Sequence, residues 1–197
     1  GVARGDPVAF LLRNDPEFVC ATFGCLQLGA IWIPVNVDYR GAWLRATLED
    51  AAARVLIVDA ELVPRVAELG PGLPFEHAIV LGSVSKAALP WPILSGADVA
   101  KRVGGVTTPE DPGTGPGDTA CVLWTSGTTG RSKGVMQSHN VWLRGALSGA
   151  ENSGIREGDA LYGCLPMYNS AAWVAHIYRA LVAGIPVGLD PAFSVHT

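Results

Sequence analysis

The sequence predicts an α/β fold in which mostly parallel β-strands are flanked by helices. Short apolar runs typical of buried strands alternate with segments of helical periodicity, and this order is the signature of a parallel sheet. Hydrophobic residues make up 49% of the 197 residues and charged residues only 16%, a balance that supports a large core and excludes intrinsic disorder. The 24 glycines and 14 prolines predict many tight turns between the elements.

The first expected element is a buried strand over residues 7–13, PVAFLLR. A helix should follow, because Asp15 can cap free backbone N–H groups and Pro16 suits the first helical position. This helix is expected to run to about Gly29. Its two faces are almost equally apolar, so we expect it to be buried on two sides.

The alternation continues through the first half of the chain. We predict strands at 31–37, 55–59 and 78–81, with helices from 41 and over 61–69. Residues 86–103 predict an irregular connection with one short helix over about 95–101.

Residues 104–118, GGVTTPEDPGTGPGD, predict a surface loop and the best internal boundary in the chain, since such a run cannot pack. The length allows one or two domains, of which one is preferred. Beyond the loop we expect strands at 119–124, 134–137, 160–165 and 186–189, and helices over 140–150 and 171–183.

Charge and apolar runs exclude several classes of protein. The net charge of −4 and the scattered basic residues offer no footprint for nucleic acid or an anionic membrane. The apolar runs are shorter than the ~20 residues of a membrane span, and the first residues lack the layout of a signal peptide. These features predict a cytoplasmic protein without a membrane span.

The four cysteines and the histidines show no spacing typical of metal ligands, so no metal site built by the protein is expected. Because the cysteines lie in apolar runs, we interpret them as small buried hydrophobic residues in a reducing compartment.

The most informative segment is TSGTTGRSKG, from Thr125 to Gly134, directly after the apolar run ACVLW. Its glycines allow successive backbone N–H groups to converge on one point, and such concave nests bind anions. Its hydroxyl groups add further donors. Lys133, one of three lysines in the chain, supplies a mobile positive charge, so the segment predicts a phosphate-binding loop.

This segment does not match two common phosphate-binding patterns. A Walker A loop requires glycine directly before the lysine, where this chain has Ser132, and the GxGxxG pattern is absent from the segment. The alternative interpretation is a flexible turn that joins two strands.

TSGTTGRSKG resembles the phosphate-binding signature of the adenylate-forming superfamily, which includes the acyl-CoA synthetases and other AMP-dependent ligases. The usual signature has proline where Ser132 stands. The likeness extends to GDPVAFLLRNDPEFVCATFGCLQLGAIWIPVN and LEDAAARVLIVD, to VMQSHNVW after the signature, and to LPMYNSAAW. It implies a partial three-layer α-β-α N-terminal domain.

The resemblance also implies a two-step reaction. A carboxylate attacks the α-phosphorus of ATP, which carries Mg²⁺, to give an acyl-adenylate and pyrophosphate; a thiol, typically coenzyme A, then displaces AMP. The implied partners are therefore a small carboxylic acid, ATP and coenzyme A. The residues that would hold the β- and γ-phosphates are Thr125, Ser126, Gly127, Thr128, Thr129, Gly130 and Lys133, the last as the group that stabilises phosphate charge.

The same resemblance places part of an acyl pocket in LPMYNSAAW. Many similar synthetases have histidine where this chain has Asn169, and an amide can form hydrogen bonds but cannot titrate. Tyr168 and Trp173 are further candidates for the pocket wall. For these two aromatic residues, packing in the core is the alternative.

The chain is expected to be a fragment, since it lacks an initiator methionine and its last strand leads into PAFSVHT. The resemblance then implies that the adenine contacts, the acidic residue that supports magnesium and the C-terminal lid domain lie beyond Thr197, in the remainder of the polypeptide. Two other functions stay open: a nonenzymatic remnant that binds a nucleotide or a partner, and a phosphotransferase that releases ADP.

Overall fold

The computed structural model describes residues 1–83, 89–103, 110–125 and 132–191. The strands are Pro7–Leu11 (β1), Ile31–Pro34 (β2), Val55–Asp59 (β3), His77–Leu81 (β4), Ile93–Ser95 (β5), Thr119–Thr125 (β6), Lys133–Ser138 (β7), Leu161–Gly163 (β8) and Val187–Leu189 (β9). The α-helices are Pro16–Gln27 (α1), Gly41–Asp50 (α2), Val63–Ala67 (α3), Gly96–Val103 (α4), His139–Ser153 (α5), Ser170–Ala172 (α6) and Tyr178–Ala183 (α7). A 3₁₀ turn, Ala60–Leu62 (η1), and a π-helical turn, Trp173–Ile177 (η2), complete the described helical segments.

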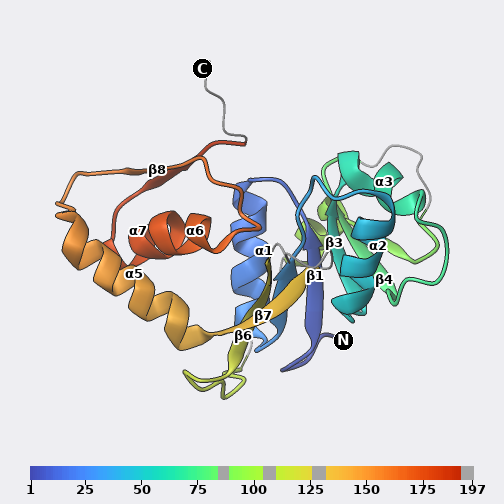
Figure 1. Cartoon of the computed structure of the whole chain (residues 1–197), viewed down its shortest axis with the longest axis horizontal. Helices are drawn as coiled ribbons and strands as arrows, with labels where there is room; N and C mark the ends of the chain where they lie inside the picture. The colour runs from blue at the N-terminus through green and yellow to red at the C-terminus, as the bar shows by residue number, and fades with distance from the viewer. Residues whose placement is uncertain (84–88, 104–109, 126–131, 192–197) are drawn as a thin grey trace.

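Seven strands form one sheet in the order β5-β4-β3-β1-β2-β6-β7 (Figure 1). Its pairs are parallel from β5 to β6, and β6 pairs with β7 antiparallel. The strands β8 and β9 form a second, two-stranded parallel sheet. This topology confirms the predicted α/β fold with mostly parallel strands.

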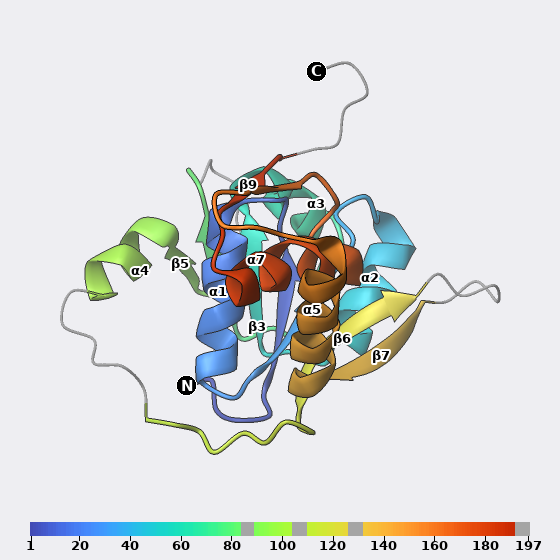
Figure 2. The same cartoon turned by 90° about the vertical axis from the view of Figure 1, so that its left-hand side faces the viewer.

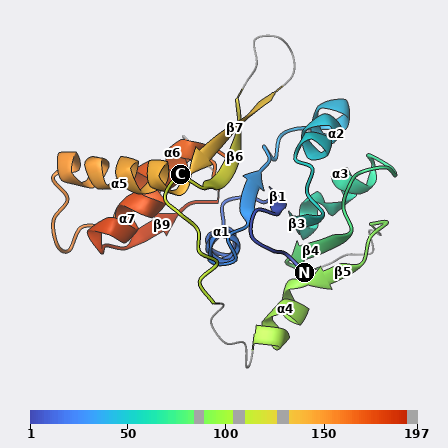
Figure 3. The same cartoon turned by 90° about the horizontal axis from the view of Figure 1, so that it is seen from below.

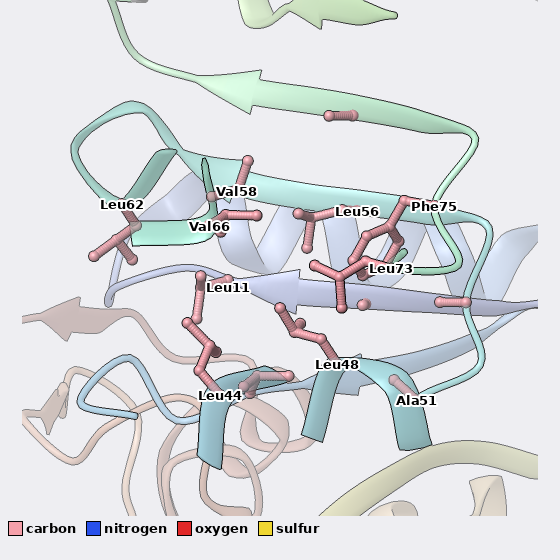
Figure 4. Packing of buried hydrophobic residues seen from close by; sticks show 14 of the residues in the cluster. Leu11, Leu44, Leu48, Ala51, Leu56, Val58, Leu62, Val66, Leu73 and Phe75 are labelled. Atoms are coloured by element: carbon pink, nitrogen blue, oxygen red, sulfur yellow. The ribbon is translucent and has the colours of Figure 1, made fainter. Parts of the chain in front are cut away.

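Helices cover both faces of the large sheet, which makes the domain three-layered. Along β1 the side chains alternate, so that Ala9 and Leu11 join one buried cluster while Val8 and Phe10 join the other. The first cluster also holds side chains of α2 and α3, and Figure 4 shows Leu44 and other leucines meeting β1 and β3. Helices α1 and α5 cover the opposite face (Figure 2).

The cluster under α1 and α5 is rich in aromatic rings. Trp32 of β2 lies at its centre, with ring centroids 4.7 Å from Trp173 and 5.9 Å from Trp142. Phe18 of α1 meets Trp173 edge to face at 5.6 Å. Because aromatic rings bury large apolar areas, this cluster joins the second half of the chain to the first.

Helix α1 begins as its sequence predicts. The Asp15 side chain accepts a hydrogen bond from the Glu17 N–H at 2.8 Å, and Pro16 occupies the first helical position. The helix ends at Gln27, and Gly29 follows with a φ of +67°, a left-handed conformation that favours glycine.

One side chain ties the carboxyl end of β1 to the region of the second sheet. The Asn14 amide donates to the carbonyls of Leu165 and Asp190, both at 3.0 Å, and its oxygen accepts from the Met167 N–H at 2.8 Å. Asn14 is only 9% exposed, so these bonds satisfy a buried amide and fix where the later segment lies.

Three expectations about the elements need correction. Residues 93–95 form β5, so the strand replaces the predicted irregular connection and the helix begins only at Gly96; pairing with β4 decides this, and three residues carry no periodicity of their own. The single helix predicted over 171–183 is α6, the π turn and α7 in succession. Of the four cysteines expected to be buried, Cys20 is exposed on α1 and Cys164 is only partly buried, whereas Cys25 and Cys121 are buried as expected.

The predicted boundary loop lies partly outside the described residues, at 104–109. Its remainder, residues 110–118, contains no helix or strand and includes Asp118, which pairs with Arg4 at 2.8 Å. Within the described part of the chain, no helix is long and apolar enough to cross a membrane.

Candidate functional site

The ends of β6 and β7 form the base of the glycine-rich segment. Thr125, the last residue of β6, lies opposite Lys133, the first residue of β7, and its hydroxyl donates to the Lys133 carbonyl at 3.3 Å. Both side chains are exposed. The antiparallel pair of β6 and β7 is called the ribbon below, and Figure 3 shows it extending away from the helices. Lys133 is therefore an exposed residue at the end of the two strands that the glycine-rich segment joins. Ser126, Gly127, Thr128, Thr129 and Gly130 lie outside the described residues.

Ser132, which directly precedes Lys133, is buried with 7% exposure. Its hydroxyl accepts a hydrogen bond from the indole N–H of Trp43 at 3.2 Å and shares another with the Tyr39 hydroxyl at 3.1 Å. The sequence singles out this serine as a departure from the usual proline and from a Walker A loop, and it does not reveal these two partners. The departure itself was the available signal, since a serine can form hydrogen bonds that a proline side chain cannot.

A pocket of about 370 Å³ opens beside the ribbon, at the carboxyl ends of β2 and β6. Such ends of parallel strands are where open α/β sheets bind ligands. The residues that line the pocket are Pro34, Asn36, Tyr39, Trp124, Thr125, Tyr168 and Asn169. Three residues singled out from the sequence, Thr125, Tyr168 and Asn169, thus lie around one cavity.

The pocket wall is polar without side chains that are charged at neutral pH. Burial raises the pKa of the Tyr168 phenol, with a smaller contribution from the charge of Asp38. Asn36 accepts the Asp38 N–H at 2.8 Å through its side chain, which fixes the turn after β2. Hydroxyls and amides in this arrangement can orient a substrate by hydrogen bonding, and they offer no nucleophile paired with a base.

Trp173 does not lie with Tyr168 and Asn169 in this pocket. It is fully buried in the aromatic cluster, and its indole N–H donates to the Met167 carbonyl at 2.7 Å. Its place corresponds to the alternative of packing in the core. The sequence could not separate the two because the position on the helix does not reveal the direction of the side chain.

Two further pockets continue along the carboxyl ends of the strands. One of about 280 Å³ shares Tyr168 with the first pocket and is also lined by Arg13 and Asn14. The other, of about 580 Å³, shares Arg13 and Asn14 with the second and reaches Asp59 at the end of β3. Substrate-sized space therefore follows this edge of the sheet from β6 to β3.

Asp59 is an ionisable group that sequence reasoning missed. Its carboxylate accepts the Arg13 N–H at 2.7 Å, and burial raises the pKa of this carboxyl from its ordinary 3.8 to about 6. Its position directly after the apolar strand VLIVD was the available signal. Among the described residues, no group of three or more His, Cys, Asp or Glu side chains could hold a metal ion.

Comparisons with known proteins identify relatives of the whole chain. The model of the family described as "AMP-binding enzyme" matches residues 1–196. A medium/long-chain-fatty-acid–CoA ligase, FadD6 of Mycobacterium tuberculosis, is 32% identical over 98% of this chain. A 3-hydroxybenzoate–CoA ligase of an Aromatoleum species is 33% identical over 85% of it. In both cases the chain spans 31% of the relative's length.

A solved structure shows the same architecture. The anthranilate CoA ligase AuaEII, crystallised in complex with anthranoyl-AMP, matches with a TM-score of 0.85 and 26% identity, over 98% of this chain and 36% of that one. Sequence and structure agree along nearly the entire chain. The chain therefore belongs to the AMP-binding enzyme family, and its relatives include acyl-CoA ligases.

Proposed function

We propose that this chain is the N-terminal part of an ATP-dependent acid–thiol ligase. In the proposed reaction a carboxylate oxygen attacks the α-phosphorus of ATP and pyrophosphate leaves. The thiol sulfur of coenzyme A then attacks the acyl carbon of the adenylate and AMP leaves, which gives a thioester. The ligase names of the relatives and the acyl-adenylate in the AuaEII structure support this proposal.

The observation that carries the proposal is the position of the ribbon base beside the pocket. Thr125 belongs to both, and Lys133 is its partner across the β6–β7 ribbon. In the proposal Lys133 and the segment 125–130 hold the β- and γ-phosphates, while the pocket receives the carboxylic acid. Fixed donors aimed at the leaving pyrophosphate would stabilise its charge as it develops, so catalysis depends on positioning and electrostatics.

Tyr168 and Asn169 are proposed to form one wall of the acyl site. Both line the pocket that contains Thr125, and Asn169 is exposed to it with an amide that can donate and accept. Because an amide does not ionise near neutral pH, we propose that Asn169 orients the substrate and takes no proton. In the proposal Mg²⁺ arrives with ATP, and its protein ligands lie outside the described residues.

The test is ATP–pyrophosphate exchange in the complete polypeptide that contains this chain. Labelled pyrophosphate is supplied with ATP and one acid at a time, from medium and long aliphatic chains to hydroxybenzoates and aminobenzoates. The expected result is label in ATP only when a suitable acid is present, with AMP released after coenzyme A is added. Release of ADP would instead identify a phosphotransferase, and the absence of exchange and of any product with every acid would favour a nonenzymatic protein that binds a nucleotide or a partner.

A further inference from the structure

The Ser132 hydroxyl is a buried polar group that links the start of β7 to helix α2 and the turn before it. We propose that Ser132 is a positioning residue, which fixes the start of β7 against Tyr39 and Trp43 and thereby sets where Lys133 meets the phosphates. This inference rests on the proposed function for its catalytic consequence. The contact itself stands on geometry alone.

The geometry is that of a complete hydrogen-bonded group. The Trp43 indole can only donate, so at 3.2 Å the Ser132 oxygen is its acceptor. The Ser132 proton is then free to point at the Tyr39 oxygen, 3.1 Å away. With 7% exposure, the serine hydroxyl has little access to water that could replace these partners.

The two partners belong to a well-fixed part of the fold. Tyr39 ends a turn in which its N–H donates to the Asn36 carbonyl at 3.1 Å. Trp43 lies in the first turn of α2, and the following Leu44 of that helix is fully buried. The two rings lie 5.7 Å apart between centroids. Ser132 therefore binds to a frame that the core of the sheet holds in place.

The consequence for the site follows from chain order. Ser132 and Lys133 are neighbours in the chain, so fixing the serine limits the directions in which the lysine side chain can extend from β7. Tyr39 also lines the pocket that contains Asn169. The same hydrogen bonds therefore relate the phosphate end of the site to its acyl end, across 93 positions of sequence.

The experiment compares Ser132→Ala, Trp43→Phe and the double variant in the complete polypeptide, with Ser153→Ala as the control. Ser153 also accepts a hydrogen bond, from Arg179 at 3.0 Å. It is the last residue of α5 and belongs to neither the glycine-rich segment nor the pocket, so its loss should not affect the KM for MgATP. Losing two hydrogen bonds of ordinary strength should raise the KM for MgATP about 10-fold in Ser132→Ala, with the KM for the acid changed less than about twofold. The control should match the wild type.

The double variant gives the decisive comparison. If Ser132 and Trp43 act through the bond between them, adding Trp43→Phe to Ser132→Ala should raise the KM for MgATP by a further factor of less than about two. A merely structural loss would lower the amount of active enzyme, and therefore kcat, without changing either KM. The proposal would be overturned if Ser132→Ala left the KM for MgATP unchanged. It would also be overturned if the KM increase of the double variant equalled the product of the two single increases.

A measurement without substrate separates this proposal from the function. Hydrogen exchange of the peptide that spans residues 132–138 should be at least about fivefold faster in Ser132→Ala, with peptides of β1 unchanged. If the wild type shows no ATP–pyrophosphate exchange but this difference is present, the proposed function fails and the positioning contact stands. Equal hydrogen-exchange rates of this peptide in the wild type and in Ser132→Ala would refute the contact.

Discussion

The strand β3 and the strand β7 belong to the same sheet and have opposite surroundings. In β3 the three central residues are buried, and Val58 has no exposure. In β7 the first four residues are exposed, including Val135 at 39% and Met136 at 73%. One strand is covered by helices on both faces, and the other extends beyond them. The sheet thus changes from a parallel core to an open antiparallel ribbon.

This difference separates the part that supports the fold from the part that we propose to hold the phosphates. A parallel strand with both faces covered resists change at nearly every position. Strand β7 has no buried residue, so we expect its position to depend on individual groups such as the neighbouring Ser132 hydroxyl. A residue that matters for catalysis can therefore be replaced there at little cost in stability.

The largest expected effect is on catalysis. Lys133→Ala should lower the rate of ATP–pyrophosphate exchange about 100-fold, because removing one preorganised charge or donor typically costs this much. The free energy of unfolding should stay within about 0.5 kcal/mol of wild type, since the side chain is exposed. Lys101→Ala, at the exposed end of α4, is the matched control. Unchanged exchange in Lys133→Ala would contradict the role of the ribbon.

A pair of valines tests the comparison directly. Val58→Ala should lower the free energy of unfolding by about 2 kcal/mol, since it removes two buried methyl groups and leaves a cavity. Val135→Ala should lower it by less than about 0.5 kcal/mol. Urea unfolding of both variants measures the difference. Equal losses would show that the ribbon is part of the core in solution.

Asp59 adds a pH-dependent test at the carboxyl end of β3. Burial raises the pKa of Asp59 to about 6, so the folded state binds more protons than the unfolded state between pH 3.8 and about 6. Stability from this group is therefore present below that window and lost as pH rises through it. Asp59→Asn keeps an oxygen that can accept the Arg13 N–H.

Relative to Asp59→Asn, the wild type should lose about 1–2 kcal/mol of stability from acid to neutral pH, with allowance for solvent screening. Urea unfolding at four pH values measures this. Asp118→Asn should show the opposite slope, because the Gly115 N–H and then Arg4 lower the pKa of Asp118. A constant difference between wild type and Asp59→Asn would exclude the raised pKa.

The smallest effect concerns a close approach within the ribbon. A Cβ atom at Gly134 would lie 2.8 Å from a methyl group of Val122 and 3.5 Å from the ring of Trp124. Gly134→Ala should therefore cost about 1 kcal/mol, at the lower end for overpacking. Gly117→Ala is the control, since nothing lies within 4 Å of its added atom. Equal stability of the two variants would indicate that the ribbon opens freely.

The sequence predicted the elements whose signals are local. The apolar run VLIVD became β3 with the expected bounds, and Asp15 with Pro16 began α1 as predicted. These succeeded because strand burial and helix capping depend on neighbours within a few residues. The glycine-rich segment pointed to the family for the same reason, since its composition is local.

Features set by distant contacts were not predictable. The strand β5 exists through its pairing with β4, and Trp173 is buried because β2 places Trp32 beneath it. The bonds of Ser132 join positions 89 and 93 residues apart, and no local pattern encodes such a pair. The sequence singles out the residues of the predicted phosphate-binding loop and does not reveal the hydrogen bonds of Ser132 to Tyr39 and Trp43.

The three hydrogen bonds of Asn14 also impose an order on folding. Their partners lie 151, 153 and 176 residues later in the chain. At about 5–20 residues per second, the last partner leaves the ribosome roughly 10 to 35 s after Asn14 does. The cluster around Leu44 and Leu56 can close during that time, whereas the aromatic cluster must wait for Trp142 and Trp173. During synthesis, half of the hydrophobic interior is therefore exposed to other proteins for much longer than the other half.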